Sequence, residues 1–226
     1  MSMMNNLKGW IGEKVTQAGM WAFLDDKEYQ RYTDILVKTE NGTTQIDHIV
    51  LSKYGLFVIE TKNYQGWIFG RSTQIEWTQS IYGKKNRFQN PLHQNYKHTK
   101  TLAQYLGIDH SLIIPIIWFI GDVTFKTEMP ANVLAGGLIP YIKEFKRVVF
   151  SEDEIVRLAS RLSFLKDCPV ASSKEHVDQL KERFNSNVTC PKCGSALVQR
   201  TARQGAAAGK TFFGCSAFPK CRYVKN

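Results

Sequence analysis

Three ionisable residues, Asp47, Glu60 and Lys62, lie within or directly after segments that are otherwise typical of buried strands. The run 56–59 is continuously apolar, as in a strand covered on both faces, and Glu60 and Lys62 follow it at once. Because side chains alternate along a strand, Glu60 and Lys62 point to the same face. A neighbouring strand can place Asp47 beside Glu60, which predicts two carboxylates next to one ammonium group.

Paired carboxylates of this kind predict a site for a hard divalent cation, because they repel each other unless a cation lies between them. Mg²⁺ (or Mn²⁺) suits Asp47 and Glu60, since it binds through one or two carboxylates together with water and phosphate oxygens. Such a metal activates water and neutralises charge on a phosphodiester, while Lys62 orients the water or stabilises the transition state. The alternative is a structural ion pair with Lys62, although burying three charges for stability alone is seldom favourable.

The cysteines predict a second metal site near the C-terminus. Cys190 and Cys193 form one pair, Cys215 and Cys221 form another, and zinc binds four such thiolates in a tetrahedron. A module of about 40 residues has too little apolar surface to fold without a bound metal or disulfide bonds. We therefore expect one structural Zn²⁺ rather than disulfides or a redox pair, and we expect Cys168 to be a buried or bystander thiol.

The charge of the chain is uneven along its 226 residues. The net charge is +10, yet residues 187–226 contain seven Lys or Arg and no acid, so the remainder carries 23 basic and 20 acidic groups, or +3. A basic module on a nearly neutral body indicates a polyanionic partner, with a solvated tail as the alternative. No apolar stretch is long enough to cross a bilayer, and no signal peptide is recognisable at the N-terminus, so we expect a cytoplasmic protein with no membrane partner.

The order of the expected elements predicts an α/β core with a mixed sheet. An amphipathic helix over 7–24 comes first, and strands follow at 32–38, 44–52 and 55–62, the last two as a hairpin. An antiparallel pair is expected near 67–70 and 74–78. After Asn90-Pro91 a helix runs to Leu106, followed by a buried strand at 112–120 and helices at 151–166 and 173–185.

One stretch between these elements is strongly basic. From residue 79 to residue 105 there are five cations, two histidines and no acid, which indicates contacts with phosphate. A solvated helix face is the alternative. The five cations are Lys84, Lys85, Arg87, Lys97 and Lys100.

The first half of the chain resembles a known family on these motifs. GWIGEKV, TQIDHIVLSKYGLFVIETKNYQGWIFG and NPLHQN resemble the nuclease-related domain (NERD) of the PD-(D/E)xK superfamily, over about residues 8–125. The resemblance implies a restriction-endonuclease-like mixed sheet flanked by helices. It also implies that Asp47, Glu60 and Lys62 are catalytic and adds Glu13 and Gln94 to them. The alternative for Glu13 is a solvated helix residue, and the alternative for Gln94 is a capping or bridging residue. His48 is expected to be a core histidine whose hydrogen bonds are satisfied.

The last part of the chain resembles a second family. CPKCGSALVQR, GKTFFG and CSAFPKCRYV resemble the four-cysteine zinc ribbon at the C-terminus of type IA topoisomerases, which implies DNA binding. Cations and aromatic side chains suit phosphate contacts and base stacking, whereas Phe213 and Tyr223 are expected in the core of the ribbon itself. The residues expected to contact nucleic acid here are Arg200, Arg203, Lys210, Phe212, Phe218, Lys220 and Arg222.

The sequence thus predicts a Mg²⁺-dependent nuclease that hydrolyses DNA phosphodiester bonds and holds DNA with a zinc ribbon. The expected domains are a nuclease core at 1–125, a mostly helical segment at 126–186 that packs on it, and the ribbon at 187–226. A non-cleaving DNA-binding or adaptor protein and an RNA-directed nuclease remain as alternatives. The oligomeric state is left open.

Overall fold

The computed structural model describes residues 23–39, 42–191, 195–205, 208–219 and 221–225. The chain divides into two compact units. Met1–Lys38 and Thr44–Val170 form the first, and Thr39–Thr43 and Ala171–Asn226 form the second. The helix expected over 7–24 lies outside the described residues, apart from its last two positions.

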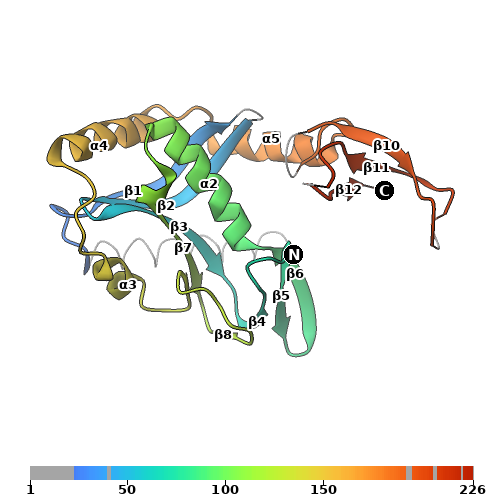
Figure 1. Cartoon of the computed structure of the whole chain (residues 1–226), viewed down its shortest axis with the longest axis horizontal. Coiled ribbons are helices and arrows are strands. Elements are labelled where there is room, and N and C mark those ends of the chain that lie inside the picture. Colours follow the sequence, from blue (N-terminus) through green and yellow to red (C-terminus); the bar gives the residue numbers. More distant parts are fainter. Residues whose placement is uncertain (1–22, 40–41, 192–194, 206–207, 220, 226) are drawn as a thin grey trace. The chain divides into compact units, whose positions relative to one another are not determined.

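A five-stranded mixed sheet forms the centre of the first unit (Figure 1). Strand β3 (Gly55–Asn63) lies in its middle, antiparallel to β2 (Gly42–Ser52) and parallel to β7 (Ile113–Ile120). The edges are β1 (Gln30–Thr39) and the short parallel strand β9 (Val133–Leu134). This confirms the predicted α/β class. The apolar run of β3 follows from its central place, because its first six residues are all buried.

Helices cover both faces of this sheet. On one face α2 (Pro91–Leu106) and α4 (Glu152–Asp167) pack, and α4 begins with the predicted capping box. On the other face α3 (Leu138–Glu144), which was not predicted, buries Ile142 against Phe57 of β3. The core between the sheet and α2 and α4 includes Ile49, Leu51, Val58, Leu102, Leu106, Leu158 and Leu162.

Helix α2 is fixed at both ends and in the middle, which matters because it crosses the face that carries the candidate site. Asn90 caps its first turn by accepting from the backbone N–H of Leu92, and Gly107 ends it in the left-handed conformation. The buried amide of Asn95 donates to the carbonyls of Val58 and Ile116, on β3 and β7. The helix therefore has a defined position on the sheet.

A second, four-stranded sheet follows directly after β3, in the order β6, β5, β4, β8. The predicted antiparallel pair is present as β4 (Gly66–Phe69) and β5 (Glu76–Ile81). Strand β6 (Lys84–Gln89) pairs with β5 and was missed, because its exposed residues show no apolar alternation. The short strand β8 (Val123–Phe125) completes the sheet in parallel with β4.

The second unit contains the predicted helix α5 (Ser173–Asn185) and a small antiparallel sheet. The sheet consists of β10 (Leu197–Thr201), β11 (Thr211–Cys215) and β12 (Val224–Lys225). Helices α3 and α4 belong to the first unit, and the three-domain division stays a prediction. Within the described ranges, none of the helices has the length and hydropathy that crossing a membrane requires.

Candidate active site and metal centre

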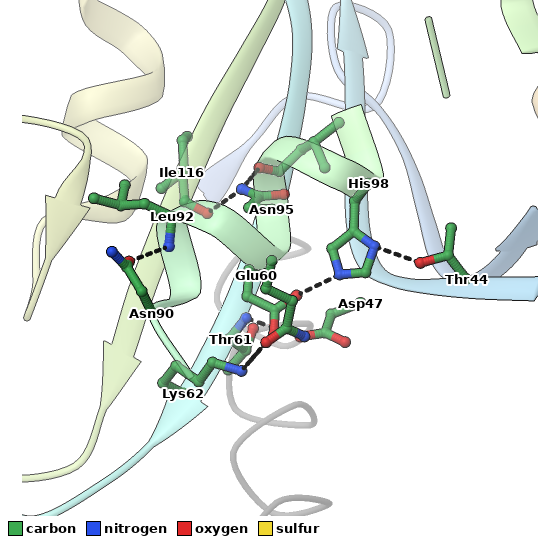
Figure 2. Close-up of polar contacts among 12 residues, drawn as sticks. Thr44, Asp47, Glu60, Thr61, Lys62, Asn90, Leu92, Asn95, His98 and Ile116 are labelled. Atoms are coloured by element: carbon green, nitrogen blue, oxygen red, sulfur yellow. Dashed lines mark hydrogen bonds and ion pairs between the residues drawn. The ribbon is translucent and has the colours of Figure 1, made fainter. Parts of the chain in front are cut away.

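At the end of β3 the sequence-predicted residues Asp47, Glu60 and Lys62 lie together (Figure 2). In the hairpin register His48 lies opposite Ile59, so the next position along the two strands sets Asp47 opposite Glu60. The backbone N–H of Thr61 donates to Oδ2 of Asp47 at 2.8 Å. Asp47 and Glu60 therefore share the face of the sheet that α2 crosses.

Lys62 links the strand to the helix. Its Nζ donates to Oε1 of Glu60 at 2.6 Å and to Oε1 of Gln94 on α2 at 3.0 Å. Gln94 thus acts as a bridge to the lysine in this structure, and its side chain points to the same face as the carboxylates. Asp47, Glu60, Lys62 and Gln94 form one cluster, whereas Glu13 lies outside the described residues.

Burial strengthens the electrostatic coupling in this cluster. The side chain of Glu60 is 3% exposed and that of Lys62 is 17% exposed. Burial by itself raises the pKa of Glu60, but the charge of Lys62 and the contact with His98 outweigh it and the pKa is lowered. Burial lowers the pKa of Lys62, but Glu60 and Asp47 raise it overall. With Asp47 counted as a carboxylate, the three residues carry a formal net charge of −1, which favours a cation.

His98 of α2 is a member of the site that sequence reasoning missed. Its Nε2 lies 3.2 Å from Oε2 of Glu60, and its Nδ1 shares a hydrogen bond of 2.8 Å with Oγ1 of Thr44 on β2 (Figure 2). The spacing could have revealed it, because His98 follows Gln94 by four residues and so lies on the same helix face. Nε2 of His98 thus faces one carboxylate oxygen of Glu60, while Lys62 donates to the other.

The donor set of the cluster fits a divalent cation. In the described part of the chain, Oε2 of Glu60 is buried and makes no hydrogen bond, although Nε2 of His98 lies 3.2 Å away. Buried oxygen atoms without a donor are costly unless a cation or water satisfies them. Asp47 and Glu60 are the residues that would hold Mg²⁺ or Mn²⁺ here.

His48 differs from expectation. It is buried on the face opposite to Asp47, as the alternation predicted, but it is not a satisfied histidine: neither ring nitrogen has a hydrogen-bond partner in the described part of the chain. Burial without a partner lowers the pKa of His48 to about 4.

The buried imidazole of His48 predicts a pH dependence of stability. The folded protein keeps His48 neutral down to a pKa of about 4, whereas the unfolded chain protonates it below about 6.5. The free energy of unfolding should therefore fall by about 2 to 3 kcal/mol from this group as the pH drops from 6.5 to 4. Urea unfolding across this range measures it. In His48→Leu the loss with falling pH should be smaller, and parallel curves for the two proteins would contradict the assignment.

Three cysteines of the second unit gather as the zinc prediction requires. The Sγ atoms of Cys190, Cys215 and Cys221 all lie within 4.8 Å of one another, and those of Cys190 and Cys221 are 3.7 Å apart. Thiolates that bind zinc at about 2.3 Å in a tetrahedron are separated by about 3.8 Å, far more than two sulfur atoms in a disulfide. The cluster has the geometry of a zinc site. Cys193 lies outside the described residues, and Cys168 is exposed and takes no part.

The aromatic residues of the ribbon divide as expected. Phe213 and Tyr223 pack against the buried cysteines and Leu197, so they belong to the core of the ribbon. Phe218 is exposed, and the guanidinium group of Arg200 lies 5.7 Å from the centre of its ring. Phe212 is partly buried, Lys220 lies outside the described residues, and the exposed cations are Arg203, Lys210 and Arg222.

The five cations of the basic stretch lie on two elements of the first unit. Lys84, Lys85 and Arg87 are exposed on β6, and Lys97 and Lys100 are exposed on α2. The ammonium group of Lys100 lies 5.6 Å from the ring centre of Tyr96. All five cations are accessible to a polyanion.

The mixed sheet, with Glu60 and Lys62 at the end of its central strand and Asp47 on the neighbouring strand, defines a protein of the nuclease-like class, and the cysteine cluster adds a zinc ribbon. A family model described as the nuclease-related domain (NERD) matches residues 8–120, half of the chain, and the chain belongs to this family. A model described as the topoisomerase DNA binding C4 zinc finger matches residues 187–226. Both resemblances drawn from the sequence are confirmed, in the predicted order.

Several individual proteins are similar to parts of the chain. An uncharacterized protein of Bacillus anthracis is 53% identical over 96 residues, which cover 42% of the chain and 45% of that protein. DNA topoisomerase 1 of Helicobacter pylori is 34% identical over 57 residues, 25% of the chain and 7% of the enzyme. The chain thus spans less than half the length of these relatives. A solved protein of unknown function aligns over 77% of the chain and 95% of its own length, at 13% identity and a TM-score of 0.30.

Proposed function

We propose that this protein is a metal-dependent nuclease that hydrolyses DNA phosphodiester bonds and that its zinc ribbon binds DNA. The observation that carries the proposal is the cluster of Asp47 on β2 with the buried Glu60 and the partly buried Lys62 on β3, in which Gln94 is hydrogen-bonded to the lysine. A protein that only binds DNA has no need for this trio. Membership of the nuclease-related family and the match to a DNA-binding zinc finger support the same function.

The roles follow from the contacts in the cluster. Mg²⁺ held by Asp47 and Glu60 would activate water and neutralise charge on the phosphate. Lys62 carries a full positive charge in a water-poor position, where its ammonium group can stabilise the negative charge that develops on the phosphate oxygens. Gln94 accepts from Lys62 and so orients this group, and His98 orients the carboxylate of Glu60.

The test is a cleavage assay with the purified full chain. Protein stripped of loosely bound metal should leave supercoiled and linear DNA intact, and added Mg²⁺ or Mn²⁺ should start nicking or degradation. Zinc content is measured before and after stripping, so that damage to the ribbon is not mistaken for loss of the catalytic metal. If the DNA stays intact at every Mg²⁺ and Mn²⁺ concentration while zinc is still bound, the proposal is wrong.

A non-cleaving DNA-binding protein is the second candidate, and one observation favours it. The 2.6 Å contact of Lys62 with a carboxylate that is 3% exposed is also what a structural ion pair looks like. Such a protein would bind DNA equally well with and without Mg²⁺ and would cleave neither DNA nor RNA. Cleavage of RNA alone in the same assay would instead identify an RNA-directed nuclease.

His98 gives a prediction specific to the proposed site. Replacing His98 by Ala removes the group that faces Oε2 of Glu60, and loss of such an outer partner typically costs about 10- to 100-fold in metal affinity or activity. We expect cleavage by His98→Ala to require more Mg²⁺ and to recover at high Mg²⁺. Mg²⁺ titration of the cleavage rate measures this. His93→Ala, an exposed histidine of the same helix, is the matched control, and equal Mg²⁺ requirements for all three proteins would exclude the role.

A further inference from the structure

The second sheet has one apolar face and one polar face. Residues paired across its strands share a face, and Ile68 and Trp77 belong to a buried cluster with Phe119 of β7. The other face therefore presents the alternate residues. One paired row on it runs across all four strands as Lys85, Ser80, Trp67 and Thr124.

Trp67 lies in the middle of this polar face, and its ring is exposed. Its exposed fraction is 52%, whereas its neighbour Ile68 is fully buried. The ammonium group of Lys126, just after β8, lies 4.5 Å from the ring centre of Trp67. Single exposed apolar residues need no explanation, but an indole ring with a cation over it is a binding platform for a planar group next to an anion.

Cations stand on both sides of Trp67. Lys85 and Arg87 are exposed on β6, two strands away and so roughly 10 Å from β4, and Lys126 lies on the opposite flank. Acids on this face include Glu76, at the first position of β5, and Asp122, beside Trp67, and the three cations outnumber these two. The charge of the face is thus complementary to a phosphate backbone that passes over the tryptophan.

A hollow adjoins the tryptophan. A cavity of about 560 Å³ is lined by Trp67, Ser80 and Thr124, by Tyr82 at the tip of the β5–β6 hairpin, and by the polar side chains of Gln65 and Asp122. It is roomy enough for a nucleobase. Its amide, hydroxyl and carboxylate groups can hydrogen-bond the edge of an unpaired base, while the carboxylate of Asp122 would repel a phosphate group.

We propose that this face binds single-stranded DNA, with a base stacked on Trp67, a neighbouring base in the hollow and phosphates on Lys85, Arg87 and Lys126. A single strand suits the surface because its bases are free to stack on an aromatic ring, whereas a duplex keeps its bases paired inside. The inference rests on the proposed function in one respect, namely that the bound strand is the substrate of the nuclease. In the sequence, β4 begins only three residues after Lys62. If the strand bound at Trp67 is the substrate, the nuclease should prefer single-stranded DNA to duplex DNA.

Photocrosslinking locates the binding independently of the zinc ribbon. Oligo-dT containing 5-iododeoxyuridine is irradiated with the full chain without added divalent metal, and crosslinked peptides are identified by mass spectrometry. We expect a crosslink at Trp67. Crosslinks in the ribbon with none at Trp67 or the hollow would overturn the proposal.

Binding of labelled oligo-dT and of a duplex of equal length, followed by anisotropy, tests the chemistry. Trp67→Ala should weaken oligo-dT binding roughly tenfold, and Trp67→Phe should restore most of it. Lys85→Ala, Arg87→Ala and Lys126→Ala should each reduce the slope of log K against log salt by about 0.7. The controls Phe164→Ala and Lys166→Ala, exposed residues of α4, should change neither.

The outcomes separate this proposal from the proposed hydrolysis. If Trp67→Ala weakens duplex binding as much as oligo-dT binding, or if oligo-rU binds as tightly as oligo-dT through Trp67, the assignment to single-stranded DNA is wrong. If oligo-dT binds through Trp67 but no DNA is ever cleaved, the single-strand binding face is supported and the proposed nuclease activity is wrong. If DNA is cleaved while Trp67→Ala changes neither oligo-dT binding nor the cleavage rate, the nuclease activity is supported and the single-strand binding face is wrong.

Discussion

Replacing Lys62 by Met is expected to lower the rate of DNA cleavage by at least about 10²- to 10³-fold while DNA binding survives. The methionine keeps the length of the side chain and its contacts with the sheet, but it removes the charge that would stabilise the phosphate in the transition state. Glu60→Gln should have an effect at least as large, because it removes one of the two carboxylates that would hold the metal.

Stability has to be separated from catalysis in this experiment. Lys62 and Glu60 form a buried ion pair, and removing one partner of such a pair typically costs about 3 to 5 kcal/mol. The double variant Glu60→Gln/Lys62→Met removes both charges of the pair together, so we expect it to unfold at a higher urea concentration than either single variant and still to be inactive. Recovery of cleavage in the double variant would contradict the catalytic roles.

The chain offers a matched control for the ion pair. Lys53 lies 3.1 Å from Glu28 in a more exposed pair of the same unit. Exposed pairs contribute little to stability, and this one lies away from the candidate site. Lys53→Met should therefore cleave DNA at the rate of the parent protein. If Lys53→Met loses as much activity as Lys62→Met, the loss reflects charge or folding in general, and the site assignment is wrong.

Replacing Cys215 by Ser is expected to reduce the zinc content from about one ion per chain to nearly none. Cys215 is buried in the cysteine cluster, and in a module of this size the binding of zinc supplies most of the folding free energy. The ribbon should then unfold, while the first unit keeps its own core. Elemental analysis and circular dichroism measure the two changes.

Loss of the ribbon should be visible in DNA affinity and in its salt dependence. Residues 187–226 contain seven cations and no acid, so unfolding them should weaken DNA binding about 10- to 100-fold at low salt. The slope of log K against log salt should flatten in proportion to the phosphate contacts that are lost. Cys168→Ser, at an exposed thiol outside the cluster, should change neither zinc content nor affinity. If the slope of log K against log salt is unchanged in Cys215→Ser, the zinc ribbon does not contribute to DNA binding.

The parts that the sequence predicted are those in which local pattern and tertiary environment agree. The apolar run of β3, the cap at Asn90 and the left-handed end at Gly107 each fix an element by a local rule. The shared face of Glu60 and Lys62 followed from strand alternation alone. Long-range neighbours are harder to predict, and Asp47 was placed only because a hairpin has a definite register.

The parts that were missed depend on contacts that leave little local signal. Strand β6 has four exposed polar residues in succession and is a strand because it pairs with β5. His98 looks like one more member of a basic helix until the fold brings it next to Glu60. His48 was expected to have a hydrogen-bond partner, but whether a buried ring finds one depends on distant backbone that no local pattern describes.

The anchoring of α2 by Asn95 also sets how fast different parts of the first unit move. Because the amide ties the helix to β3 and β7, backbone amides of these strands should exchange with deuterium only when the whole unit unfolds. The β5–β6 hairpin has exposed side chains along β6 and should exchange through local opening. If the protein acts as proposed, the residues that contact the scissile phosphate would lie in a slowly exchanging part of the unit, and the cations of β6 would lie in a part that opens locally.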